Sequence, residues 1–554
     1  MLEGFVPFPE DFVKRYKEKG YWRDKTLGEE FDEFVNQYAD RVALACKGEH
    51  ISYYEMGKKV NRLALHFIDI GLRPYDRMIL QLPNELEFVY CYFAAVKIGI
   101  IPILALPAHQ DAEISFFAQF TKARAHVVPS RFKDFSHQEM SREIRKKSPD
   151  LEFTFVTGQE VDNGFVSITA LVNDKIEERV SSETLREYRP DPMKPAVFQL
   201  SGGTTGVPKI IPRPHNDYGV TFKRAAEITN VTKDSVMGIA IPIGHNFSLN
   251  SPGLSGTLYK GGKVVVIPSP KTETVFEAIE KEKITVMPTP PALLIRCMEA
   301  PELSKYDLSS LDVVIVGGAK LNAEVAKKIR STLGCDFHQN LGMAEGMLFY
   351  TRRDDPEDLL LYTQGAPMFE DDEVRVVDEN DNDVPYGEPG ELLVRGPNTI
   401  RGYYHSSEYN KKAFTEDGFY RTGDVVRMYK GRYLTVEGRT KDTINRGGEK
   451  ISAEEVENHI LAHPRVENCA YVAMPDRIMG EKGCAFVFTK EDQDLTLEEL
   501  CRFLKEERNI AIHKLPERLE RVKEFPMTNI GKVDKKELRR LIAEKLREET
   551  KNKV

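Results

Sequence analysis

The residues with the clearest potential for chemistry lie in the stretch LSGGTTGVPK, residues 200–209. Six of its ten residues are Ser, Gly or Thr, and it follows an apolar run, residues 195–200, that predicts a buried strand. Glycine lets the backbone turn tightly and approach a ligand closely, because it has no Cβ. Hydroxyl groups, exposed N–H groups and a terminal lysine together suit a polyphosphate. We therefore predict a phosphate-binding loop formed by Ser201, Gly202, Gly203, Thr204, Thr205, Gly206 and Lys209.

Two other interpretations of this stretch have to be weighed. Clusters of Ser, Gly and Thr are often surface turns without chemistry, and the stretch alone leaves that alternative open. A P-loop NTPase would place lysine directly after the last glycine and follow it with Ser or Thr. Here Val207 and Pro208 come after Gly206. Lys209 stands only then and is followed by Ile210, so the stretch indicates a different kind of phosphate loop.

Length and composition set broad limits. A chain of 554 residues is too long for one core and should form two or more domains. The net charge of −9 disfavours a general nucleic-acid binder. The seven cysteines are scattered without a CxxC pair, which indicates neither a disulfide framework nor a zinc site and fits a reducing cytoplasm. The N-terminus lacks a signal-peptide pattern, and Lys97, Gly99 and Pro102 interrupt the most apolar segment, which disfavours a membrane span.

Strand-like apolar runs alternate with helical patterns over most of the chain. The expected strands are residues 78–82, 100–106, 126–129, 196–200, 236–243, 264–268, 284–287 and 312–316. This alternation predicts an α/β architecture with mainly parallel sheets covered by helices. From about Asp372 the pattern becomes that of an antiparallel meander.

The pattern changes again after Arg439. A glycine pair leads into a helix whose expected N-cap is Ser452, with Glu455 three residues on. An amphipathic helix is expected over residues 497–504. A last helix should place four apolar residues on one face: Leu538, Leu541, Ile542 and Leu546.

Six further segments match the adenylate-forming superfamily in its order and at roughly its spacing. They are IGHN (243–246), VGGAK (316–320), LGMAEG (341–346), YRTGD (420–424), EGRTKDTINRGGEKI (437–451) and PMTNIGKV (526–533). No single segment is decisive, but seven in register make nearly the whole chain resemble that superfamily. The resemblance implies a large N-terminal domain of two mainly parallel sheets with helices and a small antiparallel β subdomain, followed by a small mobile α+β domain.

Residues 5–29 and the segment HNFSLNSPG (245–253) resemble one branch of it, the stand-alone aryl-acid adenylating enzymes of siderophore biosynthesis, with the 2,3-dihydroxybenzoate–AMP ligases nearest. The resemblance implies that ATP activates an aryl acid, expected to be 2,3-dihydroxybenzoate, as the aryl-adenylate. The phosphopantetheine thiol of an aryl carrier protein would then take the acyl group. ATP is implied as a substrate and Mg²⁺ as a cofactor. We expect a separate carrier protein, and a monomer or homodimer.

The resemblance also assigns roles around the nucleotide. Lys532 would be the main catalytic cation at the α-phosphate, with Lys209 and Glu345 as the other catalytic residues and Glu345 as the ligand of Mg²⁺. Asp424 would accept both ribose hydroxyls, with Arg439 nearby. Taken alone, Lys532 and Glu345 could each be a solvated surface charge. The residues expected around adenine and AMP are Gly317, Gly318, Ala319, Gly342, Met343 and Ala344, the last at a position where many relatives have threonine.

The aryl-acid pocket is expected to be formed by His245, Asn246, Phe247, Ser251 and Asn340. Asn246 and Ser251 could also be turn residues. Phe247 replaces a tyrosine of the dihydroxybenzoate pattern, and Asn340 stands where an aliphatic residue usually packs on the ring. A buried asparagine must find hydrogen-bond partners, so Asn340 is a candidate for reading an additional ring substituent.

A hinge is expected at Lys441, which divides the chain into predicted domains of residues 1–440 and 441–554. Family behaviour implies that the second domain rotates between the two half-reactions. Rotation would withdraw Lys532 and bring Gly447, Gly448 and Lys450 to the site for transfer to the thiol.

Two rival functions remain open from the sequence. An aromatic acyl-CoA ligase would share the adenylation step and use coenzyme A as the acceptor, with salicylate or another substituted benzoate as a further choice of acid. A module that binds a nucleotide without turnover would need neither Lys532 nor Glu345.

Overall fold

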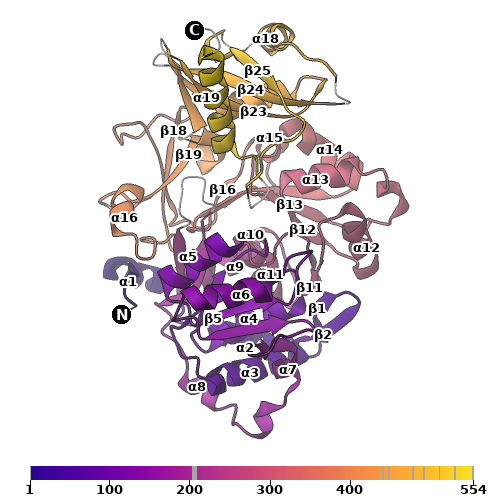
Figure 1. Cartoon of the computed structure of the whole chain (residues 1–554), viewed down its shortest axis with the longest axis vertical. Coiled ribbons are helices and arrows are strands. Elements are labelled where there is room, and N and C mark those ends of the chain that lie inside the picture. The colour runs from indigo at the N-terminus through magenta and orange to yellow at the C-terminus, as the bar shows by residue number, and fades with distance from the viewer. Residues whose placement is uncertain are drawn as a thin grey trace.

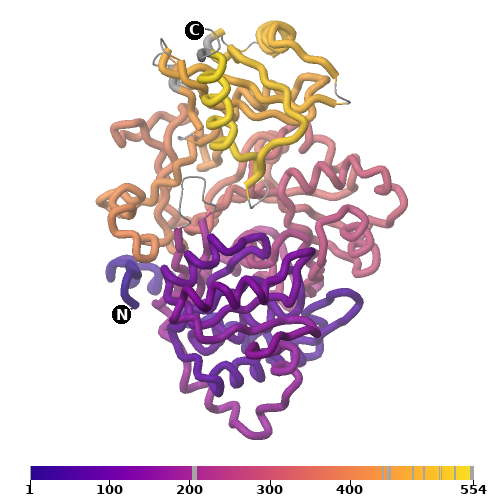
Figure 2. Tube along the Cα trace, viewed as in Figure 1, coloured from indigo at the N-terminus to yellow at the C-terminus, as the bar shows by residue number. Residues whose placement is uncertain are grey.

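The structure is a computed structural model that describes residues 2–201, 209–439, 442–446, 449–476, 479–490, 493–508, 510, 512–528 and 532–551. Within these residues the strands form four sheets. Figure 1 shows two large sheets with their helices in the lower and middle parts of the molecule, and the smaller sheets above them. In Figure 2 the last hundred residues occupy one end of the long axis.

A seven-stranded sheet has the order β7-β6-β5-β3-β4-β8-β9. All neighbours in it run parallel except β8 and β9. In this order the strands are Val166–Ser167, Phe153–Thr157, Ala125–Pro129, Arg77–Leu80, Ile101–Leu104, Pro195–Leu200 and Ile210–Pro214. Helices α5 (Asp111–Thr121) and α6 (His137–Lys147) contribute to the apolar cluster on one face.

A nine-stranded sheet has the order β16-β15-β14-β13-β12-β10-β11-β1-β2. Its six central strands pair in parallel, and β2, β15 and β16 add antiparallel edges. In order the strands are Ala366–Pro367, Leu348–Tyr350, Asp336–Gly342, Val313–Gly317, Val286–Thr289, Val236–Ile239, Lys263–Val266, Val42–Cys46 and Glu49–Ser52. Helices α12 (Thr272–Glu282), α13 (Pro291–Glu299) and α14 (Ala323–Leu333) share an apolar cluster with it.

The two large sheets share the main core. One cluster of buried residues draws on both sheets and on α2 (Leu27–Gln37), α3 (Tyr53–Ile70), α4 (Leu86–Lys97), α9 (His215–Ile228) and α11 (Gly253–Tyr259). The largest contribution comes from α4, in which all but Glu87 and Lys97 are buried. This confirms that the most apolar stretch of the sequence is core rather than surface. Among the described residues, no helix has the length and apolar character that crossing a membrane requires.

The expected antiparallel meander is a four-stranded sheet in the order β17-β18-β19-β20. Its strands are Glu373–Val377, Pro389–Arg395, Tyr420–Met428 and Leu434–Arg439. Sequential antiparallel strands need only short connections, and this is the reason the pattern was readable from turn residues. The α/β prediction with two mainly parallel sheets and a small antiparallel subdomain is thereby confirmed.

The C-terminal part forms a separate sheet in which β22, β21, β24 and β23 are neighbours and β25 pairs with β24. These strands are Glu449–Ser452, Thr443–Arg446, Gly480–Thr489, Val466–Asp476 and Arg518–Arg521. They pack with α17 (Ala453–Leu461), α18 (Leu497–Glu506) and α19 (Lys535–Lys551). The domain boundary at residues 440/441 stays a prediction, and Lys441 lies outside the described residues.

Three local expectations need correction. Ser452 does cap α17, but the Glu455 carboxylate binds Lys514 instead of closing a capping box. Leu541 is 40% exposed, whereas Leu538 and Ile542 are buried, so the apolar face of α19 is narrower than expected.

The strand expected over 236–243 ends at Ile239. Beyond it the Asn84 side chain binds Ile241 O at 3.0 Å and the Ile243 N–H at 2.8 Å. A distant side chain thus replaces strand pairing there.

The aromatic N-terminal segment packs against residues far along the chain. Helix α1 (Glu10–Glu18) lies beside α16 (Ser407–Ala413) in Figure 1. Trp22 Nε1 donates to Pro397 O at 3.1 Å, and the Arg401 guanidinium lies over the rings of Phe8 and Phe12. The first 25 residues therefore pack against residues 397–401, which lead to the buried Tyr403.

Candidate functional site

The site lies at the carboxyl ends of neighbouring parallel strands. β13 ends at Gly317 and pairs in parallel with β14, where Gly317 lies opposite Asn340. Ligands of open α/β sheets bind outside such strand ends. A Cβ at Gly317 would lie 3.0 Å from Asn340 Oδ1 and 3.1 Å from Phe247 Cζ, so a larger residue would press on both of these side chains. Gly318 and Ala319 follow on the exposed surface.

The ends of the predicted phosphate loop are held together. Ser201 N donates to Lys209 O at 3.0 Å, and Lys209 N donates to Ser201 Oγ at 2.9 Å. Lys209 Nζ lies 4.0 Å above the ring of Tyr409. Burial lowers the pKa of Lys209, and the nearby Glu345 opposes that effect. The structure therefore places these two predicted catalytic residues close enough to interact.

Glu345 is a buried carboxylate with defined partners. Its Oε1 accepts a hydrogen bond from Tyr403 OH at 2.7 Å, and Tyr403 OH lies 2.9 Å from Tyr420 OH. Its main-chain oxygen accepts from Ile400 N at 2.9 Å. Burial and the charge of Glu345 raise the pKa of Tyr403, which keeps that hydroxyl neutral and donating. Glu345 is therefore held by the Tyr403 hydroxyl through its side chain and by Ile400 through its main chain.

Asp424 and Arg439 form an ion pair across neighbouring strands. Arg439 Nε lies 3.0 Å from Asp424 Oδ1, and the two residues are register partners of β19 and β20. The charge of Asp424 raises the pKa of Arg439. Asp424 is buried, and its role at a ribose stays a prediction.

Lys532 reaches the site from the C-terminal part. Its Nζ donates to Gly318 O at 2.5 Å. Thr528 N donates to Lys532 O at 2.7 Å, and Lys532 N donates to Thr528 Oγ1 at 3.1 Å. Burial and the charge of Lys532 lower the pKa of His245 to about 4. The predicted main cation thus lies among both the nucleotide residues and the aryl-acid residues.

The predicted aryl-acid residues lie around α10 (Asn246–Asn250). His245 caps that helix, because its Nδ1 accepts from Phe247 N at 3.2 Å. Asn246 Oδ1 accepts from Tyr218 OH at 2.9 Å, and Tyr218 OH in turn accepts from Gln199 at 3.0 Å. Ser251 lies just after the helix and is buried. Asn246, Phe247 and Ser251 are therefore buried and do not form an exposed surface turn.

Asn340 is buried and has one firm hydrogen-bond partner. Its Nδ2 donates to Phe349 O at 3.0 Å. Its Oδ1 lies between Gly317 and Gly342, where a Cβ on either glycine would come within 3.0 Å. The amide nitrogen thus fixes the side chain, and its oxygen lies beside Gly317 of β13 and Gly342 of β14.

Several predicted positions lie outside the described part of the chain: Gly202, Gly203, Thr204, Thr205, Gly206, Lys441, Gly447, Gly448 and the side chain of Lys450. Met343 and Ala344 lie with Gly342 on the turn before Glu345 and are partly buried. The roles of all these residues remain predictions.

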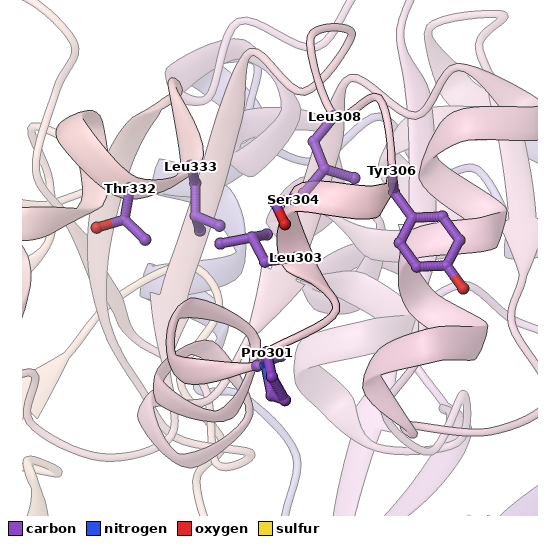
Figure 3. A pocket seen from close by; sticks show the side chains of 8 residues that line it. Pro301, Leu303, Ser304, Tyr306, Leu308, Thr332 and Leu333 are labelled. Atoms are coloured by element: carbon purple, nitrogen blue, oxygen red, sulfur yellow. The ribbon is translucent and has the colours of Figure 1, made fainter.

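A hollow of about 360 Å³ elsewhere on the molecule does not coincide with this site. It is lined by Ala300, Pro301, Leu303, Ser304, Tyr306, Leu308, Thr332 and Leu333, and Figure 3 shows leucines at its centre. None of the predicted site residues is among them.

The side chains around Glu345 suit Mg²⁺ only if the substrate supplies most of its ligands. Among the described residues, no group of three or more His, Cys, Asp or Glu could hold a metal by itself. Mg²⁺ commonly uses one or two carboxylates and completes its shell with water and substrate phosphates. A single buried carboxylate beside Lys209 fits that arrangement, with the ATP phosphates as the remaining ligands.

Sequence reasoning missed the residues that support the site: Gln199, Arg213, Tyr218, Tyr403, Tyr409 and Tyr420. Arg213 stands four residues before Asp217, but Arg213 lies in β9 and Asp217 in α9, so the helical spacing rule does not mark the pair. Tyr420 opens the YRTGD segment, but no local pattern marks Tyr218, Tyr403 or Tyr409, because their partners are more than fifteen residues away.

Comparison with protein families gives two matches. Residues 31–404 match the family described as AMP-binding enzyme, and residues 455–532 match the AMP-binding enzyme C-terminal domain.

Similar curated proteins extend over almost the whole chain. The 2,3-dihydroxybenzoate-AMP ligase of Bacillus subtilis is 44% identical over 99% of this chain and 99% of its own. A salicylyl-CoA synthase / salicylate adenylyltransferase of a Streptomyces species is 43% identical over 98% of each. The apo structure of MbtA from Mycobacterium smegmatis is 38% identical, has a TM-score of 0.74, and is matched over 97% of this chain and 99% of its own.

Proposed function

Because this chain belongs to the AMP-binding enzyme family, we propose that it is an aryl-acid–AMP ligase that activates 2,3-dihydroxybenzoate with ATP. The observation that carries the proposal is the position of Lys532. Its amine lies at Gly318 and close to His245, between the nucleotide residues and the aryl-acid residues. A cation there lies where a carboxylate and an α-phosphate would meet.

The first half-reaction is an in-line displacement at phosphorus. The aryl carboxylate oxygen forms a bond to the α-phosphorus of ATP, and the bond to the bridging oxygen breaks to release pyrophosphate. Negative charge gathers at this centre in the transition state. Oriented cations and donors there contribute the largest share of catalysis, and Lys532 and Lys209 supply them from two different parts of the chain.

The charges of the site are arranged to keep the cations available. Lys209 has its pKa lowered only by partial burial, and Glu345 close by favours its charged form. His245 stays neutral at physiological pH, because its pKa is about 4, so it does not repel Lys532. Mg²⁺, when bound at Glu345, would neutralise phosphate charge.

Asp424 would take the ribose hydroxyls while Arg439 holds that carboxylate by an ion pair. The aryl acid would lie against α10, with Asn246 fixed by Tyr218.

In the second half-reaction a thiol attacks the acyl carbon, loses its proton, and AMP leaves. We place a phosphopantetheinylated carrier protein as the thiol donor and the hinge near Lys441, with Gly447, Gly448 and Lys450 at the transfer site.

Acid-dependent ATP–pyrophosphate exchange tests the proposal. The panel is 2,3-dihydroxybenzoate, salicylate, benzoate, 3-hydroxybenzoate and anthranilate, with amino and fatty acids as controls. Exchange that is strongest with 2,3-dihydroxybenzoate is expected. Exchange only with a fatty or amino acid would contradict the aryl-acid assignment.

Coenzyme A is the second candidate acceptor, because one similar protein is named both salicylyl-CoA synthase and salicylate adenylyltransferase. Supplying preformed aryl-adenylate with either coenzyme A or a phosphopantetheinylated aryl carrier protein separates the two. Faster capture by the carrier is expected.

A further inference from the structure

Arg213 is a fully buried cation outside every motif considered so far. It lies in β9, and Asp217 lies four residues on in α9; neither side chain has any exposed surface. Arg213 Nε donates to Asp217 Oδ1 at 3.1 Å. The desolvation of a buried ion pair often exceeds its Coulombic gain, so the pair itself is a poor reason for a charge at this position.

The remaining nitrogens of Arg213 bind the main chain of two distant segments. Nη1 donates to Ala344 O at 2.7 Å, and Nη2 donates to Asn398 O at 3.0 Å. A guanidinium can make such divergent bonds at once because its donors are fixed in one plane, whereas a lysine amine cannot. Arg213 thus ties β9 to two loops.

Both of these loops hold Glu345. Ala344 directly precedes it, and Asn398 belongs to the segment whose Ile400 N donates to Glu345 O at 2.9 Å. Gly346 fits so closely against Asn398 that a Cβ would come within 2.0 Å of its oxygen. The backbone bond from Ile400 to Glu345 therefore joins the same two segments that Arg213 joins through Ala344 O and Asn398 O.

Lys209 directly precedes the same strand. β9 begins at Ile210, directly after that lysine, and Arg213 is four residues further on. One rigid strand therefore connects the amine of Lys209 with the guanidinium that fixes Ala344. Lys209 and Glu345 are expected to act on the same phosphates, and Arg213 lies on the path of bonded groups between them.

We propose that Arg213 is a positioning residue that fixes the Glu345 carboxylate relative to Lys209. This inference rests on the proposed function, since it gives Glu345 and Lys209 their common task. Arg213 touches no substrate; it acts through Ala344 and Asn398.

A double-mutant cycle tests the proposal. Arg213→Lys keeps a positive charge beside Asp217 but loses the two divergent bonds, so kcat for ATP–pyrophosphate exchange should fall at least about tenfold. In a Glu345→Gln background the same change should cost less than about threefold, because there is no carboxylate left to position. Effects of independent residues multiply. An equal loss in both backgrounds would overturn the proposal.

Arg224→Lys is the matched control. Arg224 lies on α9, donates to Met368 O at 2.9 Å and pairs with Glu227 at 3.0 Å, so it also joins a carbonyl to a carboxylate. Its partners do not contact Glu345, and exchange should stay within about twofold of the unmodified enzyme. A loss as large as that of Arg213→Lys would assign the effect to general packing.

A second variant guards against misfolding. Arg213→Met combined with Asp217→Leu replaces the buried pair with apolar side chains of similar size, which proteins often tolerate. It should retain a cooperative thermal transition and still lose exchange. Full exchange in this folded variant would refute a positioning role.

Amide hydrogen exchange of residues 340–347 gives a readout that is independent of turnover. It should be faster in Arg213→Lys than in Arg224→Lys, and equal protection in the two would contradict the inference. If the unmodified enzyme shows no acid-dependent pyrophosphate exchange, the proposed function fails. The hydrogen-exchange comparison would still decide whether Arg213 positions Glu345.

Discussion

At the scale of single residues, the site combines charges that come from separate parts of the chain. Lys209 follows the phosphate loop, Glu345 lies on a turn after β14, and Lys532 is supplied by the C-terminal part. Each charge can therefore be removed without disturbing the element that holds the others. Replacements at these positions should separate the steps of the reaction.

Lys532→Ala should slow adenylation by at least about 10²-fold, the scale of losing one oriented electrostatic donor. Capture of preformed aryl-adenylate by a thiol should change much less. Pyrophosphate exchange and single-turnover thiol capture measure the two steps. Lys536→Ala, at an exposed lysine four residues on, is the control. Equal losses in both steps would contradict a role confined to adenylation.

Asn340→Val should change the ranking of ring-substituted benzoates. The substitution removes the Oδ1 beside Gly317 and Gly342 and the bond to Phe349 O, and it replaces a polar side chain with an apolar one. Acids with an additional polar group should lose most. The measurement is kcat/KM for exchange across the acid panel. An unchanged ranking would remove Asn340 from the aryl-acid pocket.

At the scale of elements, the turn that carries Glu345 is so closely packed that it has no room for an added side chain atom at Gly346. Gly346 has φ +148 and packs against Asn398 O, so Gly346→Ala should displace the turn that carries Glu345. Exchange should fall by at least about tenfold, and the thermal midpoint should drop by several degrees. Gly387→Ala is the matched control, because Gly387 also has a positive φ, +88, but has open space around it. If the two variants behave alike, the clash with Asn398 is not the cause.

Elements made from local patterns were predictable from the sequence. Apolar runs gave the parallel strands, as for β5 over Ala125–Pro129, because both faces of such strands are buried. β10 was expected to be longer, since nothing local announces that Asn84 binds the chain beyond Ile239.

The site residues, too, could be predicted where they stand in a local sequence pattern. Glu345 and Lys532 stand in segments that resemble known motifs, and the structure brings them to one edge of the nine-stranded sheet. Arg213 was not found from the sequence. A buried arginine in an apolar strand reads as a conflict until its carbonyl partners, 131 and 185 residues away, are known.

At the scale of the whole molecule, buried ionisable groups couple stability to pH in opposite directions. His126 is fully buried between Gln81 and Ser141, and burial lowers its pKa to about 3. Asp372 is also buried, and burial raises its pKa to about 7. Below pH 6.5 the unfolded histidine gains a proton that the folded one does not, which destabilises the fold. The carboxyl has the opposite effect, so a total pH profile would mix the two.

His126→Gln removes the contribution of His126 to the pH dependence of stability and leaves that of Asp372. As pH falls from 7 to 4.5, the unmodified protein should lose about 2–3 kcal/mol of unfolding free energy relative to the variant. This loss comes from protonation of the unfolded His126 below its ordinary pKa. Urea unfolding at a series of pH values measures the difference. Parallel curves for the two proteins would show that His126 does not titrate between the folded and unfolded states.

The packing of the first 25 residues has a consequence for how the chain is made. The hydrogen bond from Trp22 to Pro397 spans 375 positions, so the ribosome must add that many residues before the partner exists. At ~5–20 residues per second this takes roughly 20–75 s. For that time Phe8, Tyr16 and Trp22 lack the partners that Pro397 and Arg401 supply in the folded chain. The nascent chain should therefore depend on holding chaperones until the 397–405 segment emerges.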